Sequence, residues 1–205
     1  MNKVVRSHRL LTLVPVCLLS AQAALAQETE ETPRADKHYI GLLATAFNFR
    51  SIGSASNEQA TGSGGTLIAG SHINDMFHAE LRAGGGLRDA EVPSSDLTLS
   101  VDYFASWYIG LHYPVTDYAN VYGQAGFSFI HGTAELENTD ENQNAQFQDL
   151  EGDFPDSSFS ISWVLGLDVK VMSDTYLVLE GGKLFEDTST DANTFQFSAG
   201  LKYEF

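Results

Sequence analysis

The chain has 205 residues, with 27 acidic and 11 basic side chains and a formal net charge of −16. A nucleic-acid-binding face needs clustered lysine and arginine, so this balance excludes nucleic acid as an expected partner. The only cysteine is Cys17, which excludes an internal disulfide. After residue 26 the sequence contains no run near the ~20 apolar residues of a membrane-spanning helix.

The first 26 residues have the pattern of a secretory signal peptide. A basic start is followed by an apolar run over 10–26, which closes on the small-x-small pattern Ala24-Leu25-Ala26. We predict cleavage after Ala26, with an uncleaved anchor helix as the alternative. The remaining 179 residues have no cysteine and a net charge of −19. The stretch 27–37 is predicted to be a flexible periplasmic leader.

Beyond Lys37 the apolar side chains recur at every second position, which is the period of a strand with one apolar face. The pattern predicts eight strands, at 38–49, 64–73, 76–87, 96–113, 119–132, 158–171, 175–185 and 193–205. Short turns at 74–75, 114–117 and 172–174 alternate with four longer loops. This layout is typical of an eight-stranded antiparallel transmembrane up-and-down β-barrel, so we predict an all-β barrel domain over 38–205. A soluble β-sandwich or lipocalin-like barrel is the alternative.

The two faces of the predicted strands indicate which side contacts lipid and which side lines the lumen. Apolar residues occupy every second position from Leu97 to Tyr113, which predicts one unbroken lipid-facing surface on that strand. The opposite faces are rich in glycine, serine and alanine, which suits a narrow interior. Aromatic residues near strand ends resemble the girdles found at membrane interfaces; they are Tyr113, Phe159, Tyr203 and Phe205.

Two segments carry a resemblance to a known family. "GSHINDMFHAELRAGGG" at 70–86 resembles the second hairpin of the small outer-membrane barrels, the superfamily of opacity proteins, OmpX-like proteins and OmpA barrels. "FQFSAGLKYEF" at 195–205 resembles the terminal signal read by the barrel-assembly machinery, with Phe197, Leu201, Tyr203 and Phe205 as its apolar residues. The resemblance implies a monomer in the outer membrane of a Gram-negative bacterium, in contact with lipid and lipopolysaccharide.

Charged residues at lumen positions form the first candidate site. The predicted interior polar network comprises Glu80, Arg82, Asp102, Asp168, Lys170, Glu180 and Lys202. Glu204 is expected on the same face, with His78 and His112 nearby. A buried carboxylate needs a partner, so we predict a salt-bridged plug centred on Glu80 and Arg82. An ion path is the alternative.

The third long loop is the second candidate site. Segment 133–158 has no basic residue and eight acids: Glu135, Glu137, Asp140, Glu141, Asp149, Glu151, Asp153 and Asp156. Part of it, "NTDENQNAQFQD", matches the first positions of a calcium loop but lacks the glycine at position six and the glutamate at position twelve. We expect a solvated surface loop. The alternatives are divalent-cation bridging to lipopolysaccharide and contact with a basic surface partner.

An enzymatic alternative rests on "FIHGTA", which offers His131 and Thr133. It resembles one family of lipid A deacylases, in which a nucleophilic serine follows a histidine by two residues. Threonine fits that pattern less well, and the sequence shows no third partner. We therefore predict a non-enzymatic barrel without cofactor or metal, acting in membrane integrity or surface interaction. A narrow OmpW-like channel and a lipid A-modifying enzyme remain the alternatives.

Overall fold

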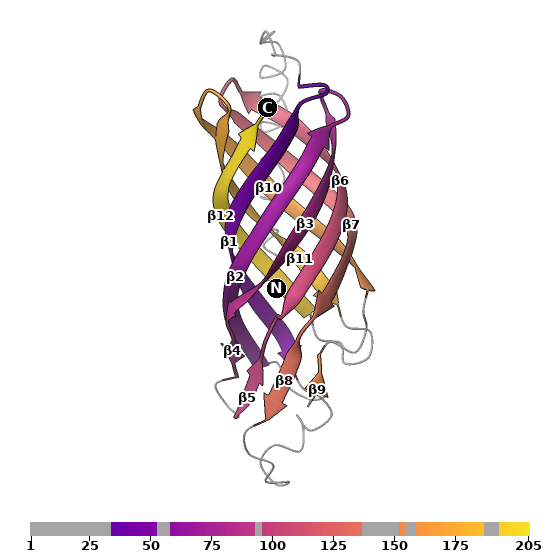
Figure 1. The fold of residues 1–205 in the computed structure, drawn as a ribbon, viewed down its shortest axis with the longest axis vertical. Helices are drawn as coiled ribbons and strands as arrows, with labels where there is room; N and C mark the ends of the chain where they lie inside the picture. The colour runs from indigo at the N-terminus through magenta and orange to yellow at the C-terminus, as the bar shows by residue number, and fades with distance from the viewer. Residues whose placement is uncertain (1–33, 53–57, 93–95, 137–151, 155–158, 187–192) are drawn as a thin grey trace, which may run out of the picture. The chain divides into compact units, whose positions relative to one another are not determined.

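Eight long strands close into an antiparallel barrel in the order β1-β12-β11-β10-β7-β6-β3-β2 (Figure 1). The computed structural model describes residues 34–52, 58–92, 96–136, 152–154, 159–186 and 193–205. The barrel strands are β1 (His38–Ile52), β2 (Glu58–His72), β3 (Phe77–Arg88), β6 (Tyr103–Thr116), β7 (Ala119–His131), β10 (Phe159–Met172), β11 (Thr175–Glu186) and β12 (Asn193–Glu204). The predicted fold class is confirmed.

The first strand pairs with the last one along the whole length of β12. Tyr39 lies opposite Glu204, and the register continues without a shift to Arg50 opposite Asn193. Beyond the last strand, the Phe205 N–H donates to the His38 carbonyl at 2.8 Å. The closed sheet therefore has no free edge, which is what a spanning sheet requires when lipid offers no hydrogen-bond partners.

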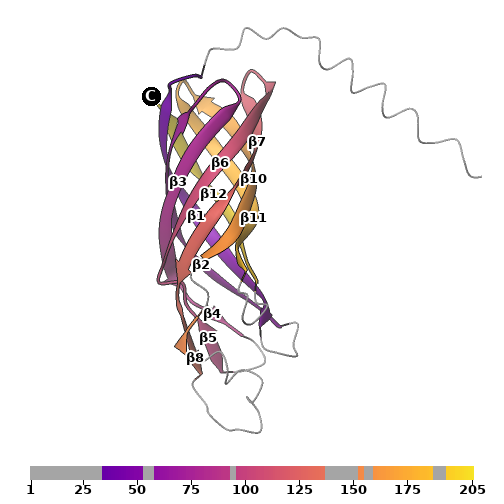
Figure 2. The same ribbon diagram turned by 90° about the vertical axis from the view of Figure 1, so that its right-hand side faces the viewer.

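A small second sheet extends the barrel at its loop end. It contains β4 (Ala90–Glu91), β5 (Leu97–Leu99), β8 (Thr133–Leu136) and β9 (Gly152–Asp153), in the order β4-β5-β8-β9. Figure 2 shows β4, β5 and β8 beyond the barrel strands, at the end opposite the C-terminus. The alternation of side chains does not predict this sheet, because its strands have only two to four residues.

The single strand predicted over 96–113 is wrong, since the chain forms β5 and then β6. The alternation of burial breaks between them, where Asp102 and Tyr103 are exposed in succession. Leu97 and Leu99 therefore face inward at 1% and 0% exposure, whereas Trp107 faces outward at 45%. The apolar period of two continues across the break, but the apolar residues of β5 face the interior, whereas those that continue the repeat on β6 face outward.

The turns follow the prediction with one displacement. β2 and β3 are joined through 73–76, where the Asn74 side chain accepts hydrogen bonds from the Met76 and Phe77 N–H groups at 2.9 and 2.8 Å. Such an Asx turn stabilises a tight connection. The turn predicted at 114–117 lies later, because pairing of β6 with β7 continues through a register shift to Thr116. Residues 173–174 join β10 to β11.

The outer face of the barrel is an apolar belt. Leu42, Leu81 and Leu165 are each 60% or more exposed, which would be an aggregation hazard in water. Tyr103, Phe129 and Phe159 form a row of aromatic rings towards the loop end, with ring centroids 6.0 and 5.5 Å apart. Tyr203 and Phe205 stack at the turn end. Within the described residues, no helix is long and apolar enough to span a membrane.

The interior is apolar at the loop end. A buried cluster from both sheets fills it: Phe47, Phe49, Ile52, Ala60, Ala90, Val92, Leu97, Leu99, Val101, Phe104, Ile130, Ala134, Leu136, Phe154, Leu184 and Phe185. The Phe47 and Phe104 rings meet edge to face, with centroids 5.8 Å apart. The small sheet thus contributes an apolar plug to the mouth of the barrel. The charged side chains lie nearer the turn end.

Candidate functional site

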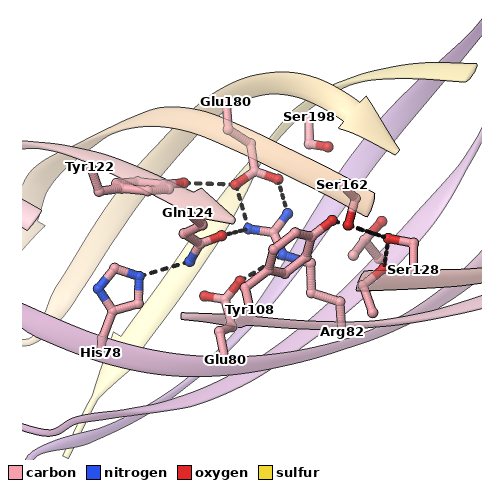
Figure 3. Close-up of polar contacts among 12 residues, drawn as sticks. His78, Glu80, Arg82, Tyr108, Tyr122, Gln124, Ser128, Ser162, Glu180 and Ser198 are labelled. Carbon is pink, nitrogen blue, oxygen red and sulfur yellow. Dashed lines mark hydrogen bonds and ion pairs between the residues drawn. The ribbon is translucent and has the colours of Figure 1, made fainter. Parts of the chain in front are cut away.

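Arg82 on β3 is the centre of the buried polar network (Figure 3). Its Nε donates to Glu80 Oε1 at 2.6 Å, and its Nη2 donates to Glu180 Oε2 at 2.9 Å and to Gln124 Oε1 at 2.7 Å. Its Nη1 donates to Glu180 Oε1. The two-point contact between the guanidinium fork and Glu180 fixes both side chains, since bidentate pairs combine strength with geometry.

Two tyrosine hydroxyls also donate to these carboxylates. The Tyr39 hydroxyl donates to Glu80 Oε2 at 2.8 Å, and the Tyr122 hydroxyl donates to Glu180 Oε2 at 2.7 Å. Each tyrosine lies opposite a glycine on a neighbouring strand, Gly70 for Tyr39 and Gly166 for Tyr122. The absence of a side chain there gives each ring room to lie across the lumen.

A second ion pair lies nearer the turns. The Lys202 ammonium on β12 donates to Asp168 Oδ2 on β10, and both residues are at most 6% exposed. The ammonium also lies 4.8 Å from the centre of the Tyr39 ring, within the range of a cation–π contact. The Lys202–Asp168 pair and the Arg82 network therefore adjoin the same tyrosine.

The turn end is closed by Glu204, which binds two partners. Its Oε1 lies 3.0 Å from His72 Nε2 and accepts from Arg34 Nη2. The Arg34 and Ala35 backbone N–H groups donate to Asp75 Oδ1 at 3.0 and 3.3 Å. Residues 34–37, predicted to end a flexible leader, are thus bonded to the barrel. We call residues 34–37 the strap.

Hydroxyl groups occupy the middle of the lumen. Thr45 bonds Thr66 at 2.7 Å and Ser198 at 3.1 Å. On the other side, Ser128 bonds Ser106 at 2.7 Å and Ser162 at 2.8 Å. These short side chains bond one another across neighbouring strands and line the lumen beside the Arg82 network, since Arg82 lies opposite Ser106 and Glu180 opposite Ser198.

Five predicted members of the network lie in the interior, and two do not. Glu80, Arg82, Asp168, Glu180 and Lys202 are all at most 8% exposed. The prediction is wrong for Asp102, which is exposed at the break between β5 and β6, and for Lys170, which is exposed at the turn end of β10. Asp102 accepts instead from Ser100 and Thr133.

Sequence reasoning missed several interior contacts. Tyr39, Tyr122 and Gln124 have the strand parity of lumen residues, so the period of two was a signal that could have found them. Arg34 had no such signal, because it lies before the first strand and its partner Glu204 is 170 residues away.

Asp102 lies beside His131 and Thr133, but the three residues are not arranged as the enzymatic alternative requires. His131 Nε2 lies 3.7 Å from Asp102 Oδ2, which supplies the third group absent from the sequence pattern. The Thr133 hydroxyl, however, donates to the same Asp102 oxygen at 3.3 Å. A nucleophilic hydroxyl needs to bond its base, and here the hydroxyl and the imidazole both address the carboxylate.

The other predicted residues lie at the surface or outside the described residues. Phe197, Leu201, Tyr203 and Phe205 are 50% to 64% exposed on the lipid-facing side of the last strand and terminus. In the acidic loop, Glu135 is exposed on β8 and Asp153 lies on β9. Outside the described residues lie Glu137, Asp140, Glu141, Asp149, Glu151 and Asp156.

Solved structures of other proteins share this fold. Ail, the attachment invasion locus protein of Yersinia pestis, solved with the heparin analogue sucrose octasulfate, is 11% identical with a TM-score of 0.55, covering 83% of this chain and 99% of Ail. Neisserial surface protein A is 18% identical with a TM-score of 0.53, covering 85% of this chain and all of that chain. OprG of Pseudomonas aeruginosa is 14% identical with a TM-score of 0.51, covering 84% and 97%. At these identities the similarity shows the fold alone.

A family comparison adds the sequence relationship. The family described as "Outer membrane protein beta-barrel domain" matches residues 11–205. No curated protein sequence matches the chain. The apolar belt, the closed barrel and this match agree, and the chain is an integral β-barrel of the Gram-negative outer membrane that belongs to the outer membrane protein β-barrel domain family.

Proposed function

We propose that this barrel is a closed, non-enzymatic membrane anchor that presents its loop end at the cell surface, for membrane integrity or surface interaction. The observation that carries the proposal is the double filling of the lumen. The Arg82 network occupies the turn half and the apolar cluster around Phe47 and Phe104 occupies the loop end. An eight-stranded barrel is only just wide enough for its own side chains, so a continuous water path has no room.

The loop end supplies the surface for an interaction. A hollow of about 550 Å³ is lined there by Asp96, Thr98, Thr133, Ala134, Glu135, Leu136 and Gly152. Two of these residues, Asp96 and Glu135, are acidic. The whole segment 133–158, which includes Glu135, has further acidic residues and no basic residue. Ail was solved with a polyanion, whereas the carboxylates here favour a cationic partner, either a basic protein surface or divalent ions that bridge to lipopolysaccharide.

Electrical recording in planar bilayers tests the closed lumen against the channel alternative. The folded protein should give no sustained current, and Arg82→Ala should give none either, because the apolar cluster still closes the loop end. A steady pore current from the wild-type monomer would overturn the proposal.

Mass spectrometry of lipid A from cells with and without the gene tests the enzymatic alternative, and identical lipid A is expected.

The surface role is tested by capture of whole cells on polylysine-coated beads. Cells that carry a variant with all eight carboxylates of 133–158 changed to amides should be captured less than wild-type cells at matched barrel levels. The control changes Asp117 and Asp174 to asparagine in the short turns, where the beads have no access, and should leave capture unchanged. Equal capture of wild type and the loop variant would remove the loop end as an interaction surface.

A further inference from the structure

Three histidines pack against one another inside the turn end of the barrel. They are His72 on β2, His78 on β3 and His112 on β6, and each is at most 4% exposed. The ring centroids of His72 and His112 are 4.8 Å apart, those of His78 and His112 are 5.7 Å apart, and those of His72 and His78 are 6.0 Å apart. Each ring therefore has the other two as direct neighbours.

The polar atoms of this cluster are incompletely bonded. His72 Nδ1, His78 Nδ1 and both ring nitrogens of His112 are buried without a hydrogen-bond partner. A cavity of about 10 Å³, the space of one water molecule, is lined by all three rings. Among the described residues, no group of three such side chains is arranged to hold a metal ion. His72 Nε2 donates to Glu204 and His78 Nε2 accepts from Gln124, so the unbonded lone pairs lie on His72 Nδ1 and on one nitrogen of His112, where they can take up protons.

The cluster shares a carboxylate with the strap. His72 Nε2 and Arg34 Nη2 both bind Glu204 Oε1. The two backbones are also joined, because the His72 N–H donates to the Lys37 carbonyl at 2.9 Å and the Asp36 N–H donates to the His72 carbonyl at 3.2 Å. A change in the charge of His72 thus acts directly on the group that holds Arg34.

The charged groups around the cluster are already paired with one another. Arg34 and Lys202 lie at the same end and already bind Glu204 and Asp168, while Glu80 and Glu180 bind Arg82. Each acid therefore has a basic partner before a histidine is charged, although Glu80 and Glu180 share the single charge of Arg82. Three uncharged polar side chains also face the cluster: Tyr39, Tyr122 and Gln124. Tyr176 on β11 lies under Arg34.

We propose that the three histidines form a proton-operated latch on the strap. At neutral pH the strap closes the turn end. Protonation places like charges on touching rings beside Arg34 and Lys202, and this repulsion drives Arg34 away from both oxygens of Glu204, which it contacts in the closed form. Because burial disfavours a charged ring, whereas hydrated histidine takes up protons near pH 6.5, the open state binds more protons than the closed state. The closed form therefore loses population as the pH falls.

A nitroxide at position 35 measures the latch. Ala35 is exposed, so Ala35→Cys in a Cys17→Ser background takes the label without disturbing the interior. The full-length protein, folded in nanodiscs, is titrated from pH 8 to pH 4 while the mobility of the label is recorded by electron paramagnetic resonance. We expect an immobile label at pH 8 and a mobile one below about pH 6, with the open-to-closed ratio rising by up to about tenfold per pH unit for each proton taken up.

Variants separate the histidines from other titrating groups. His112→Gln removes a ring that has no hydrogen bond to lose and should flatten the transition and move it to lower pH. His38→Gln, at an exposed position of the same end, should behave as wild type. Arg34→Ala should mobilise the label already at pH 8. The proposal is overturned by a label that ignores pH, by a transition unchanged in His112→Gln, which would point to carboxylates, or by an immobile label in Arg34→Ala.

Discussion

Arg82 of β3 and Glu180 of β11 form a two-point ion pair across the lumen, although 98 residues separate them in the chain. Both residues are at most 8% exposed, and Arg82 also holds Glu80 at 2.6 Å. The guanidinium therefore links opposite walls of the barrel. Its single positive charge balances the charge of one of the two buried carboxylates, Glu80 and Glu180.

Removal of this guanidinium should be costly. Arg82→Ala leaves Glu80 and Glu180 buried without their base, and breaking a buried pair from one side costs about 3–5 kcal/mol. We expect that loss in the free energy of reversible unfolding from lipid vesicles. Arg88→Ala, at an exposed position of the same strand, should stay within about 0.5 kcal/mol. Equal losses in the two variants would show that the pair contributes no special stability.

The glycine under Tyr122 should be intolerant of a side chain. A Cβ at Gly166 would lie 2.2 Å from Tyr122 Cζ, so Gly166→Ala pushes the ring away from Glu180. Overpacking of this kind costs about 1–3 kcal/mol, measured by the same unfolding assay. Gly65→Ala is the matched control, because its nearest neighbour would be the Leu43 carbonyl at 3.9 Å. A stable Gly166→Ala variant would mean that Tyr122 has another place to go.

The final residue should matter more for assembly than for stability. Phe205 is 64% exposed, and Phe205→Ala retains the two backbone hydrogen bonds with His38. Refolding in detergent should be almost normal, while outer-membrane levels in cells should fall sharply if the assembly machinery reads this ring. Phe159→Ala, 70% exposed away from the terminus, serves as the control. Normal cellular levels of Phe205→Ala would leave the ring as lipid packing alone.

Export should remove residues 1–26. The apolar run ends in Ala24-Leu25-Ala26, and cleavage after a small-x-small pattern is the general rule for such segments. N-terminal sequencing or intact mass of protein purified from outer membranes should therefore find Gln27 first. A chain that still begins at Met1 would favour the anchor-helix alternative.

Much of the barrel is encoded locally. The alternation in 158–171 and 193–205 and the short turns predicted eight antiparallel strands, and eight strands form the barrel, because side-chain period and turn chemistry depend on neighbours in the chain. The same period placed Glu80, Arg82, Asp168, Glu180 and Lys202 on the lumen face. Periodicity was misleading at Asp102, where the chain leaves the small sheet and enters the barrel without losing its apolar repeat.

Only the tertiary structure decided which residues meet across the lumen. The register of all eight strands around the closed barrel fixes three ion pairs: Arg82 with Glu180, Lys202 with Asp168, and Arg34 with Glu204. No local sequence pattern contains the combined register of eight strands. The apolar plug arises in the same way, because Leu97 of the small sheet and Phe104 of the barrel join one buried cluster only when both sheets have formed. The sequence by itself determined the strands and their faces, whereas closure of the barrel determined the contacts inside it.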